Sequence, residues 1–402
     1  MDNQGLRVAM NAHLVSFGQT YRNAGVSRYT FTLLEGLSRA DTDQRYTVFI
    51  NRGEAEAAAM LTSGERVQIV PGSWSTKRPA YRVLWEQTTL PEELRRRHID
   101  VFHSPVNVLP LRLPCASVVT VLDLAFLHYP QYFRPARRIY QRTFTTSSAR
   151  RATLVVTIAE STKRELVERF HIPEERVRVI YPAIDADYQP ERDVQRLAEF
   201  RARHDLPEHY LLFLGTLEPR KNLDVLVEAY ARLRRMDELA PPLVLAGAKG
   251  WYYDSLFERV RALGLERHIT FAGYVSRDEQ PLWYAGADLF IYPSVYEGFG
   301  LPIAEALACG TPTITSNVSS MPEAGGPVAV QVDPGDSEGL AHAMQRVLSE
   351  PTARERTLIE GPRWTRRFSV ERMVAGYVDT YREAAELAGK RHGKRGRVRG
   401  GY

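Results

Sequence analysis

The sequence predicts an α/β protein built from two Rossmann-like, doubly wound domains. Short runs of β-branched or aromatic residues alternate with longer amphipathic segments along nearly the whole chain. Parallel strands joined by helical crossovers produce this pattern. At 402 residues, the chain is also longer than a single domain usually is. The alternation and the length together favour two parallel sheets.

The first predicted domain covers residues 1–190. Runs of β-branched and aromatic residues predict its strands at 6–11, 46–50, 67–70, 101–103, 117–122, 154–157 and 177–181. Amphipathic stretches between them predict helices that include 26–39, 82–97, 136–150 and 160–170. This succession is expected of one doubly wound sheet.

The second predicted domain covers residues 200–370. Its strands are predicted at 210–214, 243–246, 269–271, 289–292 and 313–315. The segment 182–207 has three prolines, many charges and no clean periodicity, so we expect a linker there, with a hinge near Pro182. Apolar residues at helical spacing predict a helix over 371–388 that crosses back onto the first domain. The basic segment 389–402 is expected to be a disordered tail.

The composition excludes several classes of protein. With 44% apolar and 25% charged residues, the chain is typical of globular proteins and is not mainly disordered. No run reaches the roughly 18 apolar residues of a membrane span. The first residues show no basic-then-apolar leader, and two cysteines, Cys115 and Cys309, cannot form a disulfide framework or a four-thiolate zinc site. We therefore expect a cytoplasmic protein.

Charge is distributed unevenly along the chain. The net charge of residues 1–200 is +5, that of residues 201–389 is −6, and that of residues 390–402 is +6. Basic clusters of the first domain lie at 95–97, at Arg134, Arg137, Arg138 and Arg142, and at 150–151. These clusters and the tail are either solvated or attracted to an anionic surface, such as the inner face of a membrane. Nucleic acid is disfavoured as the substrate, since no helix-turn-helix, zinc-finger or aromatic RNA-binding signature is found.

The most informative stretch is YPSVYEGFGLPIAEALACGTPTITS, residues 292–316. It predicts a strand end, a glycine-containing turn and a helix with Pro302 in its first turn, where the missing N–H costs nothing. Backbone N–H groups at such a turn attract phosphate-like anions. Glu297 and Glu305, eight positions apart, add carboxylates that can accept hydrogen bonds from paired hydroxyls. The stretch therefore favours a sugar-containing, anionic ligand.

The string EGFGLPIAEALACGTP resembles the signature of the retaining glycosyltransferases of family 4, which have the two-domain B-type glycosyltransferase fold with a central cleft. Further similar blocks occur in the same order as in the family: GVSRYTFTLLEGL, DVFHSP, VVTVLDLAFLHYP, ESTKRELVERF, FLGTLEPRKNLDVLVEAY, LAGAKGW, FAGYVSRDEQPLWYAGADLFIYPS, SSMPEAGG and VDPGD. The resemblance covers nearly the whole chain up to about residue 387. It implies that residues 1–190 form an acceptor-side domain and residues 200–370 a nucleotide-sugar-binding domain.

The resemblance assigns donor-binding roles position by position. Glu305 would bind the ribose hydroxyls of a nucleotide sugar, and Glu297 would face the donor sugar as a catalytic residue. Arg220 and Lys221 would hold the diphosphate, whose developing charge fixed cations can stabilise.

Backbone contacts to the donor are also implied. Phe299, Gly300 and Leu301 would supply them from the turn, and Gly25 would approach the donor phosphates from a loop of the first domain. Many relatives have two glycines at this last point, whereas this chain has Ala24 and Gly25.

The catalytic assignments in the first domain depart from the family pattern. Members often carry a histidine before the aspartate of the strand-end motif, and Leu122 stands at that position here. Asp123 survives and could contact the donor sugar or the acceptor hydroxyl, although a turn-stabilising role is the alternative. His103 is the next catalytic candidate, with a hydrogen-bonded structural group as its alternative. His128 is weaker.

The predicted reaction is transfer of a hexose from a nucleotide diphosphate sugar, with retention of configuration, to a hydroxyl of a glycan or lipid-linked acceptor in polysaccharide biosynthesis. GDP-mannose is the first choice of donor, and a UDP-sugar is the alternative. No metal and no cofactor are predicted, because no Asp-x-Asp motif or His/Glu ligand spacing is found. The alternatives are a catalytically silent scaffold, a nucleotide-sugar epimerase and a pyridoxal-dependent phosphorylase.

Overall fold

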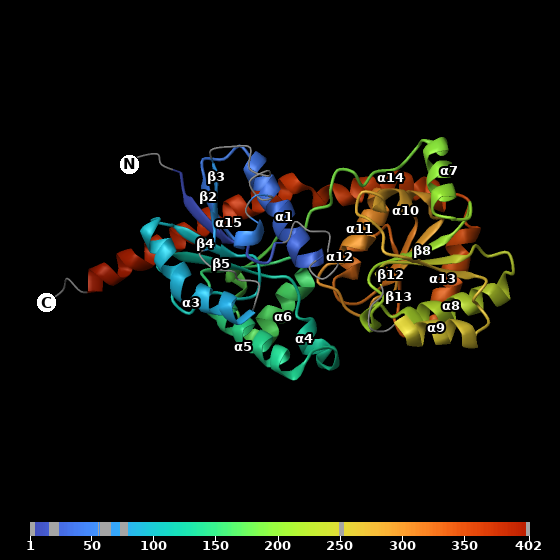
Figure 1. Ribbon diagram of the computed structural model, residues 1–402, viewed down its shortest axis with the longest axis horizontal. Helices are drawn as coiled ribbons and strands as arrows, with labels where there is room; N and C mark the ends of the chain where they lie inside the picture. Colours follow the sequence, from blue (N-terminus) through green and yellow to red (C-terminus); the bar gives the residue numbers. More distant parts are fainter. Residues whose placement is uncertain are drawn as a thin grey trace. The chain divides into compact units, whose positions relative to one another are not determined.

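The computed structural model describes residues 5–15, 24–54, 56, 66–72, 79–248 and 253–398. The chain divides into two compact units (Figure 1). Unit 1 consists of Met1–Ala183 together with Val370–Tyr402, and unit 2 consists of Ile184–Ser369.

Unit 1 contains a seven-stranded parallel sheet in the order β3-β2-β1-β4-β5-β6-β7. Its strands are β1 (Arg7–Asn11), β2 (Arg45–Ile50), β3 (Val67–Pro71), β4 (Val101–Ser104), β5 (Ala116–Val121), β6 (Leu154–Thr157) and β7 (Val177–Val179). The central strands β4, β5 and β6 are buried along their whole length. Burial on both faces explains the β-branched runs in β5 and β6.

Helices cover both faces of this sheet. They are α1 (Ala24–Arg39), α3 (Pro79–Arg96), α4 (Ala125–His128), α5 (Pro135–Arg151), α6 (Glu160–Phe170) and α15 (Val370–Val398). Figure 1 shows α1 and α15 on one face and α3, α5 and α6 on the other. Trp85 of α3 and Leu166 of α6 belong to one apolar cluster with Phe102 of β4.

Helix α15 belongs to unit 1 although it lies at the end of the chain. It packs on α1, β4 and β5. A Cβ added to Gly36 of α1 would lie 2.5 Å from Val374 and 2.7 Å from Val370, so glycine permits this close approach. The amide of Gln44 donates to the backbone carbonyl of Val378 at 3.1 Å. These contacts attach the helix to the unit.

Unit 2 contains a six-stranded parallel sheet in the order β10-β9-β8-β11-β12-β13. Its strands are β8 (Leu211–Leu214), β9 (Leu243–Ala246), β10 (Ile269–Gly273), β11 (Leu289–Tyr292), β12 (Thr313–Ser316) and β13 (Val330–Val332). The order matters for the site because β8 and β11 are neighbours. Parallel neighbours bring the loops after their carboxyl ends together.

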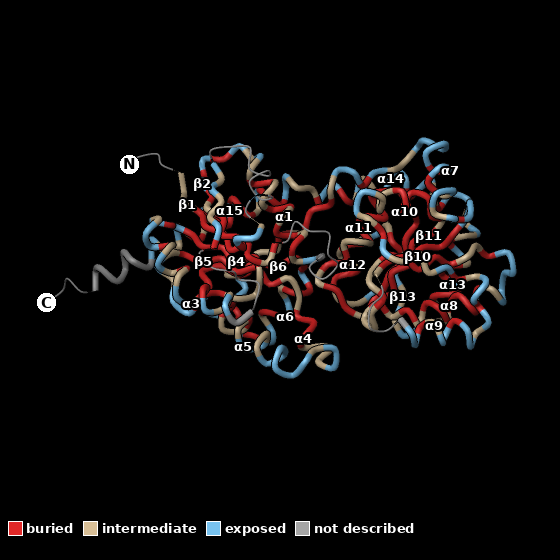
Figure 2. The backbone as a smooth tube through the Cα atoms, viewed as in Figure 1, coloured by how far each residue is buried: buried red, intermediate tan, exposed pale blue. Residues whose placement is uncertain are grey.

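The helices of unit 2 are α7 (Val194–Arg203), α8 (Leu223–Met236), α9 (Tyr253–Ala262), α10 (Gln280–Gly286), α11 (Leu301–Ala308), α12 (Met321–Gly325), α13 (Ser337–Ser349) and α14 (Ala353–Thr365). Helices α8 and α13 pack together, as do α11 and α14, and the two pairs lie on opposite faces of the sheet in Figure 1. Buried residues concentrate along the strands of each unit (Figure 2).

The predicted α/β class with two doubly wound parallel sheets is confirmed. Two local expectations are wrong. The expected linker 182–207 contains helix α7, because the Asp193 carboxylate caps it by accepting from the N–H groups of Gln195 and Arg196, and because Leu197 and Phe200 are buried. Of the expected disordered tail, residues 389–398 continue helix α15, and residues 399–402 lie outside the described part of the chain.

Candidate functional site

The turn between β11 and α11 is the first part of the candidate site. Gly300 is the N-cap of α11 and has φ of +99°, a left-handed conformation that favours glycine. A Cβ at this position would lie 2.9 Å from Cδ1 of Ile303. Pro302 occupies the first turn of α11. Helix α11 therefore begins directly after the glycine-containing turn. This is the arrangement in which backbone N–H groups at a helix N-terminus bind anions.

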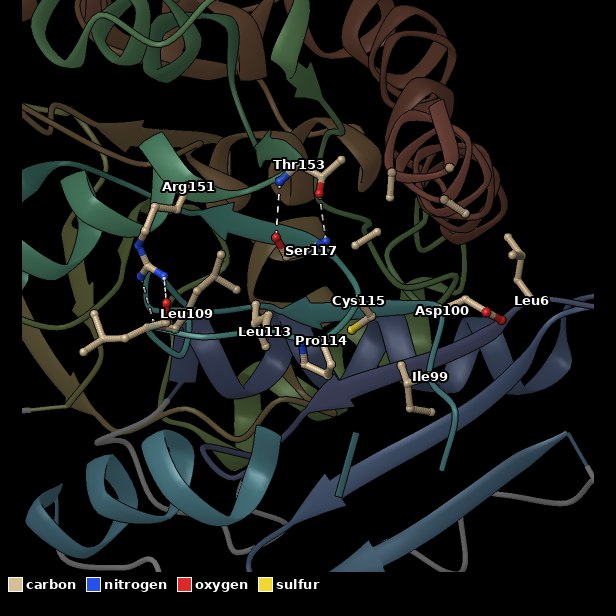
Figure 3. A pocket seen from close by; sticks show the side chains of 15 residues that line it. Leu6, Ile99, Asp100, Leu109, Leu113, Pro114, Cys115, Ser117, Arg151 and Thr153 are labelled. Atoms are coloured by element: carbon tan, nitrogen blue, oxygen red, sulfur yellow. Dashed lines mark hydrogen bonds between the residues drawn. The ribbon is translucent and has the colours of Figure 1, made fainter. Parts of the chain in front are cut away.

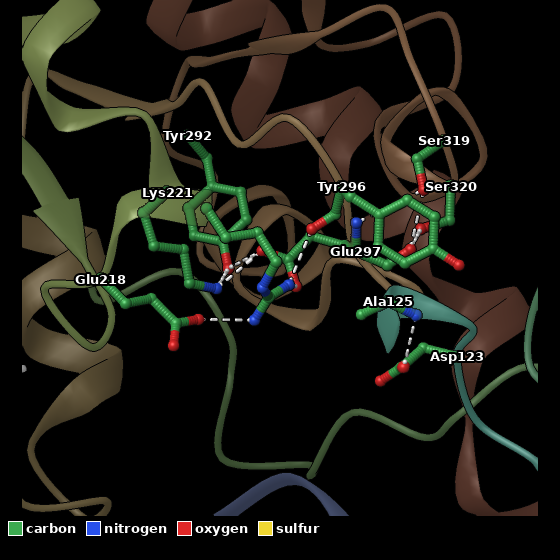
Figure 4. Close-up of polar contacts among 10 residues, drawn as sticks. Asp123, Ala125, Glu218, Lys221, Tyr292, Tyr296, Glu297, Ser319 and Ser320 are labelled. Carbon is green, nitrogen blue, oxygen red and sulfur yellow. Dashed lines mark hydrogen bonds and ion pairs between the residues drawn. The ribbon is translucent and has the colours of Figure 1, made fainter. Parts of the chain in front are cut away.

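The loops after β8 and β11 bring two cations and two carboxylates together (Figure 4). Nζ of Lys221 lies 2.6 Å from Oε1 of Glu297, and Nη1 of Arg220 lies 2.5 Å from Oε2. Arg220 also donates to the carbonyl of Tyr296 at 2.7 Å and to Glu218 at 2.6 Å. The backbone N–H of Val295 donates to the carbonyl of Arg220, which joins the two loops.

Tyr292, the last residue of β11, completes this network. Its hydroxyl donates to Oε1 of Glu297 at 3.0 Å and accepts from Nζ of Lys221 at 2.5 Å. The same ammonium lies 4.8 Å from the Tyr292 ring centroid. Lys221 is thus held from two sides in a buried environment.

The electrostatics of the network favour its charged form. Burial raises the pKa of Glu297, but Arg220 and Lys221 outweigh that effect and lower the pKa to about 2. Burial lowers the pKa of Lys221, with Glu297 acting in the opposite direction. Burial and the Glu297 charge raise the pKa of Tyr292, so its hydroxyl stays neutral. The arrangement is an oriented pair of cations balanced by the carboxylates of Glu297 and Glu218, and such cations can pair with a diphosphate.

Serines fix the backbone of Glu297. The hydroxyls of Ser319 and Ser320 each donate to its carbonyl at 2.8 Å. The N–H of Glu297 donates to Oγ of Ser319 at 3.3 Å. These contacts hold the turn that carries the carboxylate.

Glu305 lies inside α11 and is buried. Its Oε2 accepts a hydrogen bond from the Tyr284 hydroxyl at 3.1 Å. Phe299 is also buried, with its ring edge-on to that of Phe368 at 4.9 Å between centroids. Leu301 is half-buried at the first position of α11.

Two predicted residues lie at the carboxyl edge of the sheet in unit 1. Asp123 follows β5, is half-buried, and its Oδ1 accepts from the N–H of Ala125 at 3.0 Å (Figure 4). This contact is the turn-stabilising role that was the alternative for Asp123. It uses one of the two oxygens of the Asp123 carboxylate. Leu122 precedes Asp123 and is half-buried.

Gly25 differs from the expected loop position because it lies in the first turn of α1. It is exposed, and a Cβ there would meet nothing within 4 Å. The fold of unit 1 therefore does not itself require glycine at this point.

The structure places His103 in the hydrogen-bonded environment that was the alternative to a catalytic role. The residue is fully buried in β4, its Nε2 hydrogen-bonds with the Thr120 hydroxyl at 2.8 Å, and its Nδ1 with the Tyr381 hydroxyl at 2.8 Å. Burial lowers its pKa to about 3, so the ring is neutral. His103 joins α15 to the sheet. His128 pairs with Glu165 at 2.5 Å, which also gives it a structural contact.

Sequence reasoning missed the polar residues that support the cations and glutamates. These residues are Glu218, Tyr284, Tyr292, Ser319 and Ser320. All five stand inside the recognised blocks, so the blocks contained a signal for them, but only the strand order shows which atoms meet.

A cavity of about 950 Å³ in unit 1 lies at the opposite edge of its sheet (Figure 3). Its lining includes residues at the amino-terminal ends of β4, β5 and β6, among them Asp100, Ala116 and Thr153. Arg151 donates to the carbonyls of Pro110 and Leu111, and Ser117 and Thr153 exchange hydrogen bonds. These polar groups already have partners, and the cavity is separate from the residues assigned above.

Comparisons with known proteins identify the family. Residues 23–188 match the model described as Glycosyltransferase Family 4, and residues 195–364 match that described as Glycosyl transferases group 1. The chain is 33% identical over 282 residues to O-antigen chain mannosyltransferase B of Escherichia coli, which covers 70% of this chain and 74% of that protein. It is 30% identical over 203 residues to the serotype-specific mannosyltransferase WbdA of Escherichia coli, covering 50% of this chain and 25% of that protein.

A solved structure supports the fold. HepE of Anabaena, in complex with UDP and glucose, has a TM-score of 0.70 and 16% identity, covering 94% of this chain and 100% of that one. The chain belongs to glycosyltransferase family 4, and the enzyme is a glycosyltransferase.

None of the described helices is both long and apolar enough to cross a membrane. No group of three or more His, Cys, Asp or Glu side chains suited to a metal ion occurs in the described part of the chain.

Proposed function

We propose that this enzyme transfers a hexose from a nucleotide diphosphate sugar to a hydroxyl of a glycan or lipid-linked acceptor in polysaccharide biosynthesis. The observation that carries the proposal is the buried cluster of Arg220, Lys221 and Glu297 beside the turn that starts α11. Two adjacent cations at such a turn match the two phosphates of the donor.

Each donor group has a proposed partner in unit 2. Arg220 and Lys221 hold the diphosphate and stabilise the charge that develops as it leaves. Glu305 accepts hydrogen bonds from the ribose hydroxyls, and Glu297 accepts them from the donor sugar. Backbone groups of Phe299, Gly300 and the first residue of α11 complete the contacts.

In the proposed reaction the anomeric configuration is retained and no metal ion is required. The bond from the anomeric carbon to the diphosphate oxygen breaks, and the acceptor oxygen forms a new bond to the same carbon. The acceptor proton passes to the departing phosphate, so no protein base is needed. The two cations supply the charge compensation that a divalent metal would otherwise provide.

The donor is proposed to be GDP-mannose. The relatives named as O-antigen and serotype-specific mannosyltransferases support mannose. The complex of HepE with UDP and glucose makes a UDP-sugar the alternative. Thermal unfolding in the presence of UDP-, GDP- and dTDP-sugars tests the assignment. The largest rise in Tm is expected with GDP-mannose, and protection by another donor alone would replace it.

A catalytically silent scaffold is the second candidate, because Leu122 stands where many family members carry a histidine. Turnover distinguishes the two functions. A scaffold would bind no nucleotide sugar, or would bind one without consuming it, whereas the enzyme consumes it.

The enzyme is proposed to work at the cytoplasmic face of a membrane that carries its acceptor. Support comes from the amino-terminal half of α5 and the residue before it, where Arg134, Arg137, Arg138 and Arg142 are exposed beside Ile139. Residues 135–151 contain no acidic side chain. Together, basic and apolar side chains favour anionic lipid headgroups.

The other basic clusters give less support for membrane contact. Arg95, Arg96 and Arg97 pair with glutamates of their own helix. Sedimentation with anionic and neutral liposomes at low and high salt tests the proposal. Salt-sensitive binding to anionic vesicles is expected, and absence of binding at low salt would contradict it.

A further inference from the structure

A buried polar cluster in unit 1 has no role in the donor site described above. It comprises Asn11, His13, Arg82, Glu86 and Tyr140. Asn11 ends β1, His13 follows it, Arg82 and Glu86 lie on α3, and Tyr140 lies on α5. The carboxyl ends of β1 and β5 lie at the same edge of the parallel sheet, so the cluster shares this edge with Asp123. Ligands of doubly wound sheets bind at this edge.

Direct contacts join the cluster's residues of β1 and α3, and Tyr140 belongs to it because the charges of Glu86 and Arg82 act on its hydroxyl. The Asn11 amide donates to Oε1 of Glu86 at 2.9 Å, and the N–H of His13 donates to Oδ1 of Asn11 at 3.2 Å. Nε of Arg82 lies 3.7 Å from Oε1 of Glu86. The ring of His13 packs on that of Trp85, with 4.2 Å between centroids. The cluster is therefore built from residues of β1, α3 and α5 and of the segment after β1. The ring of Trp85 packs against His13 and fixes its position.

Several buried polar atoms of the cluster lack a close hydrogen bond. Among the described residues, the two ring nitrogens of His13 have no close hydrogen-bond partner, Nε of Arg82 reaches only Oε1 of Glu86 at 3.7 Å, and the Tyr140 hydroxyl faces Arg82 without a close hydrogen bond. Leaving such atoms unpaired costs stability. Arg82 and Tyr140 retain part of their exposure, which gives the cluster an approach from solvent. Buried donors and acceptors without a close hydrogen bond, at an edge where ligands bind, leave capacity for hydrogen bonds to a ligand.

The charge of the cluster indicates the partner's chemistry. Burial, followed by the charge of Arg82, lowers the pKa of His13 to about 4, while the nearby Ile50 carbonyl acts in the opposite direction. The neutral ring offers one donor and one acceptor. The charges of Arg82 and Glu86 offset each other. A cluster without net charge suits hydroxyl groups, which both donate and accept, better than it suits phosphate.

We propose that Asn11, His13, Arg82, Glu86 and Tyr140 bind hydroxyl groups of the acceptor glycan. This inference rests on the proposed function, because the cluster would bind the acceptor of that reaction. The donor residues lie in unit 2, whereas this cluster belongs to unit 1, which the family resemblance assigns to the acceptor. Glu86 and Arg82 provide the charge-assisted hydrogen bonds, and His13 and Tyr140 add neutral ones.

The test uses the full chain and three substitutions: Glu86→Gln, His13→Phe and Tyr140→Phe. Tyr81→Phe is the matched control, because Tyr81 is on the same helix and 51% exposed. The probes are methyl glycosides of mannose, glucose, galactose, rhamnose and N-acetylglucosamine. Binding is measured by saturation-transfer NMR without donor, and the KM of the best probe is measured with donor.

We expect Glu86→Gln to weaken acceptor binding about tenfold or more, and each of the other two variants to weaken it several-fold. Nucleotide affinity, acceptor-independent donor hydrolysis and Tm should remain close to wild type, as should every property of the control. Unchanged acceptor binding in the three variants would overturn the inference. Loss of acceptor binding only together with a lowered Tm and weakened nucleotide binding would also overturn it, because the cluster would then be structural.

The same experiment separates this inference from the proposed function. If wild type binds nucleotide and hydrolyses donor but no glycoside binds or accepts sugar, the acceptor cluster is wrong and the donor assignment stands. If a glycoside binds through the cluster but no donor is consumed, the reaction is wrong and the cluster stands.

Discussion

Lys221 and Glu297 form a buried ion pair, with 2.6 Å between Nζ and Oε1. The residues are far apart in the sequence and meet because β8 and β11 are adjacent in the sheet. The carboxylate holds the ammonium in place and at the same time balances its charge. A diphosphate that enters this site therefore meets cations that are already oriented.

Replacing Glu297 with Gln is expected to reduce turnover on the order of tenfold or more without weakening the binding of nucleoside diphosphate. The substitution removes the proposed contact to the donor sugar but leaves Arg220 and Lys221 with less internal charge compensation, which favours the diphosphate. Calorimetric titration and initial rates provide the two values. Glu338→Gln, an exposed change on α13, is the control. Lost nucleotide affinity with normal turnover would reverse the role assigned to Glu297.

Replacing Glu305 with Gln should instead weaken nucleotide affinity. Loss of a charge-assisted hydrogen bond to a ribose hydroxyl costs about 1.5 to 3 kcal/mol. Glutamine can still accept from the Tyr284 hydroxyl, so the fold of α11 should persist. The affinity of the variant for a nucleoside diphosphate should fall, whereas its affinity for inorganic pyrophosphate, which has no ribose, should stay unchanged. Equal losses for both ligands would remove Glu305 from the ribose site.

Two glycines of α1 are expected to have different roles, because Gly36 makes a packing contact and Gly25 is proposed to approach the donor. Gly36→Ala should lower the free energy of unfolding by about 1 to 3 kcal/mol, because the new methyl group meets Val374 and Val370. Gly25→Ala meets open space and should not destabilise unit 1. If Gly25 permits the backbone to approach the donor, its substitution should weaken donor binding. Unchanged donor binding would remove Gly25 from the site.

Unit 1 should lose stability as the pH falls below about 6.5. Burial lowers the pKa of His103 to about 3, so between these values the unfolded chain binds a proton that the folded chain does not. The hydroxyls that face the ring, Tyr377 and Tyr381, have raised pKa values and stay neutral. The His103 contribution approaches about 1.4 kcal/mol per pH unit within this window.

Urea unfolding at several pH values between 7 and 4 measures this dependence. His103→Gln can still bond to Thr120 and Tyr381 but does not titrate. Its stability should fall less steeply with acid than that of wild type. Equal slopes would show that the buried histidine does not carry the effect.

Sequence patterns predicted the regular elements where burial is continuous. Strands β6, β9 and β11 and helix α6 have the expected bounds, because their apolar runs or stripes are uninterrupted. Strand β13 was missed, because Val330–Val332 is a short edge strand without a buried residue. Helix α7 was missed because two buried side chains and a cap are a weak signal among many charges.

The site could be predicted only in part. The family blocks pointed to Arg220, Lys221 and Glu297, but their mutual ion pairs depend on the order of the strands. The hydrogen bond that His103 makes with Tyr381 could not be predicted, because Tyr381 lies 278 residues later in the chain. The cluster around Glu86 carried no recognisable motif and emerges only from the buried polar atoms without a close hydrogen bond.

Release of nucleoside diphosphate from UDP-, GDP- and dTDP-sugars tests the central claim most directly. Wild-type enzyme should consume at least one donor, with GDP-mannose preferred, and should do so equally well in the presence of EDTA. An added acceptor glycan should accelerate release and gain a sugar with the configuration of the donor. Nucleotide binding without consumption of any donor, with the glycans tested as acceptors, would contradict the account.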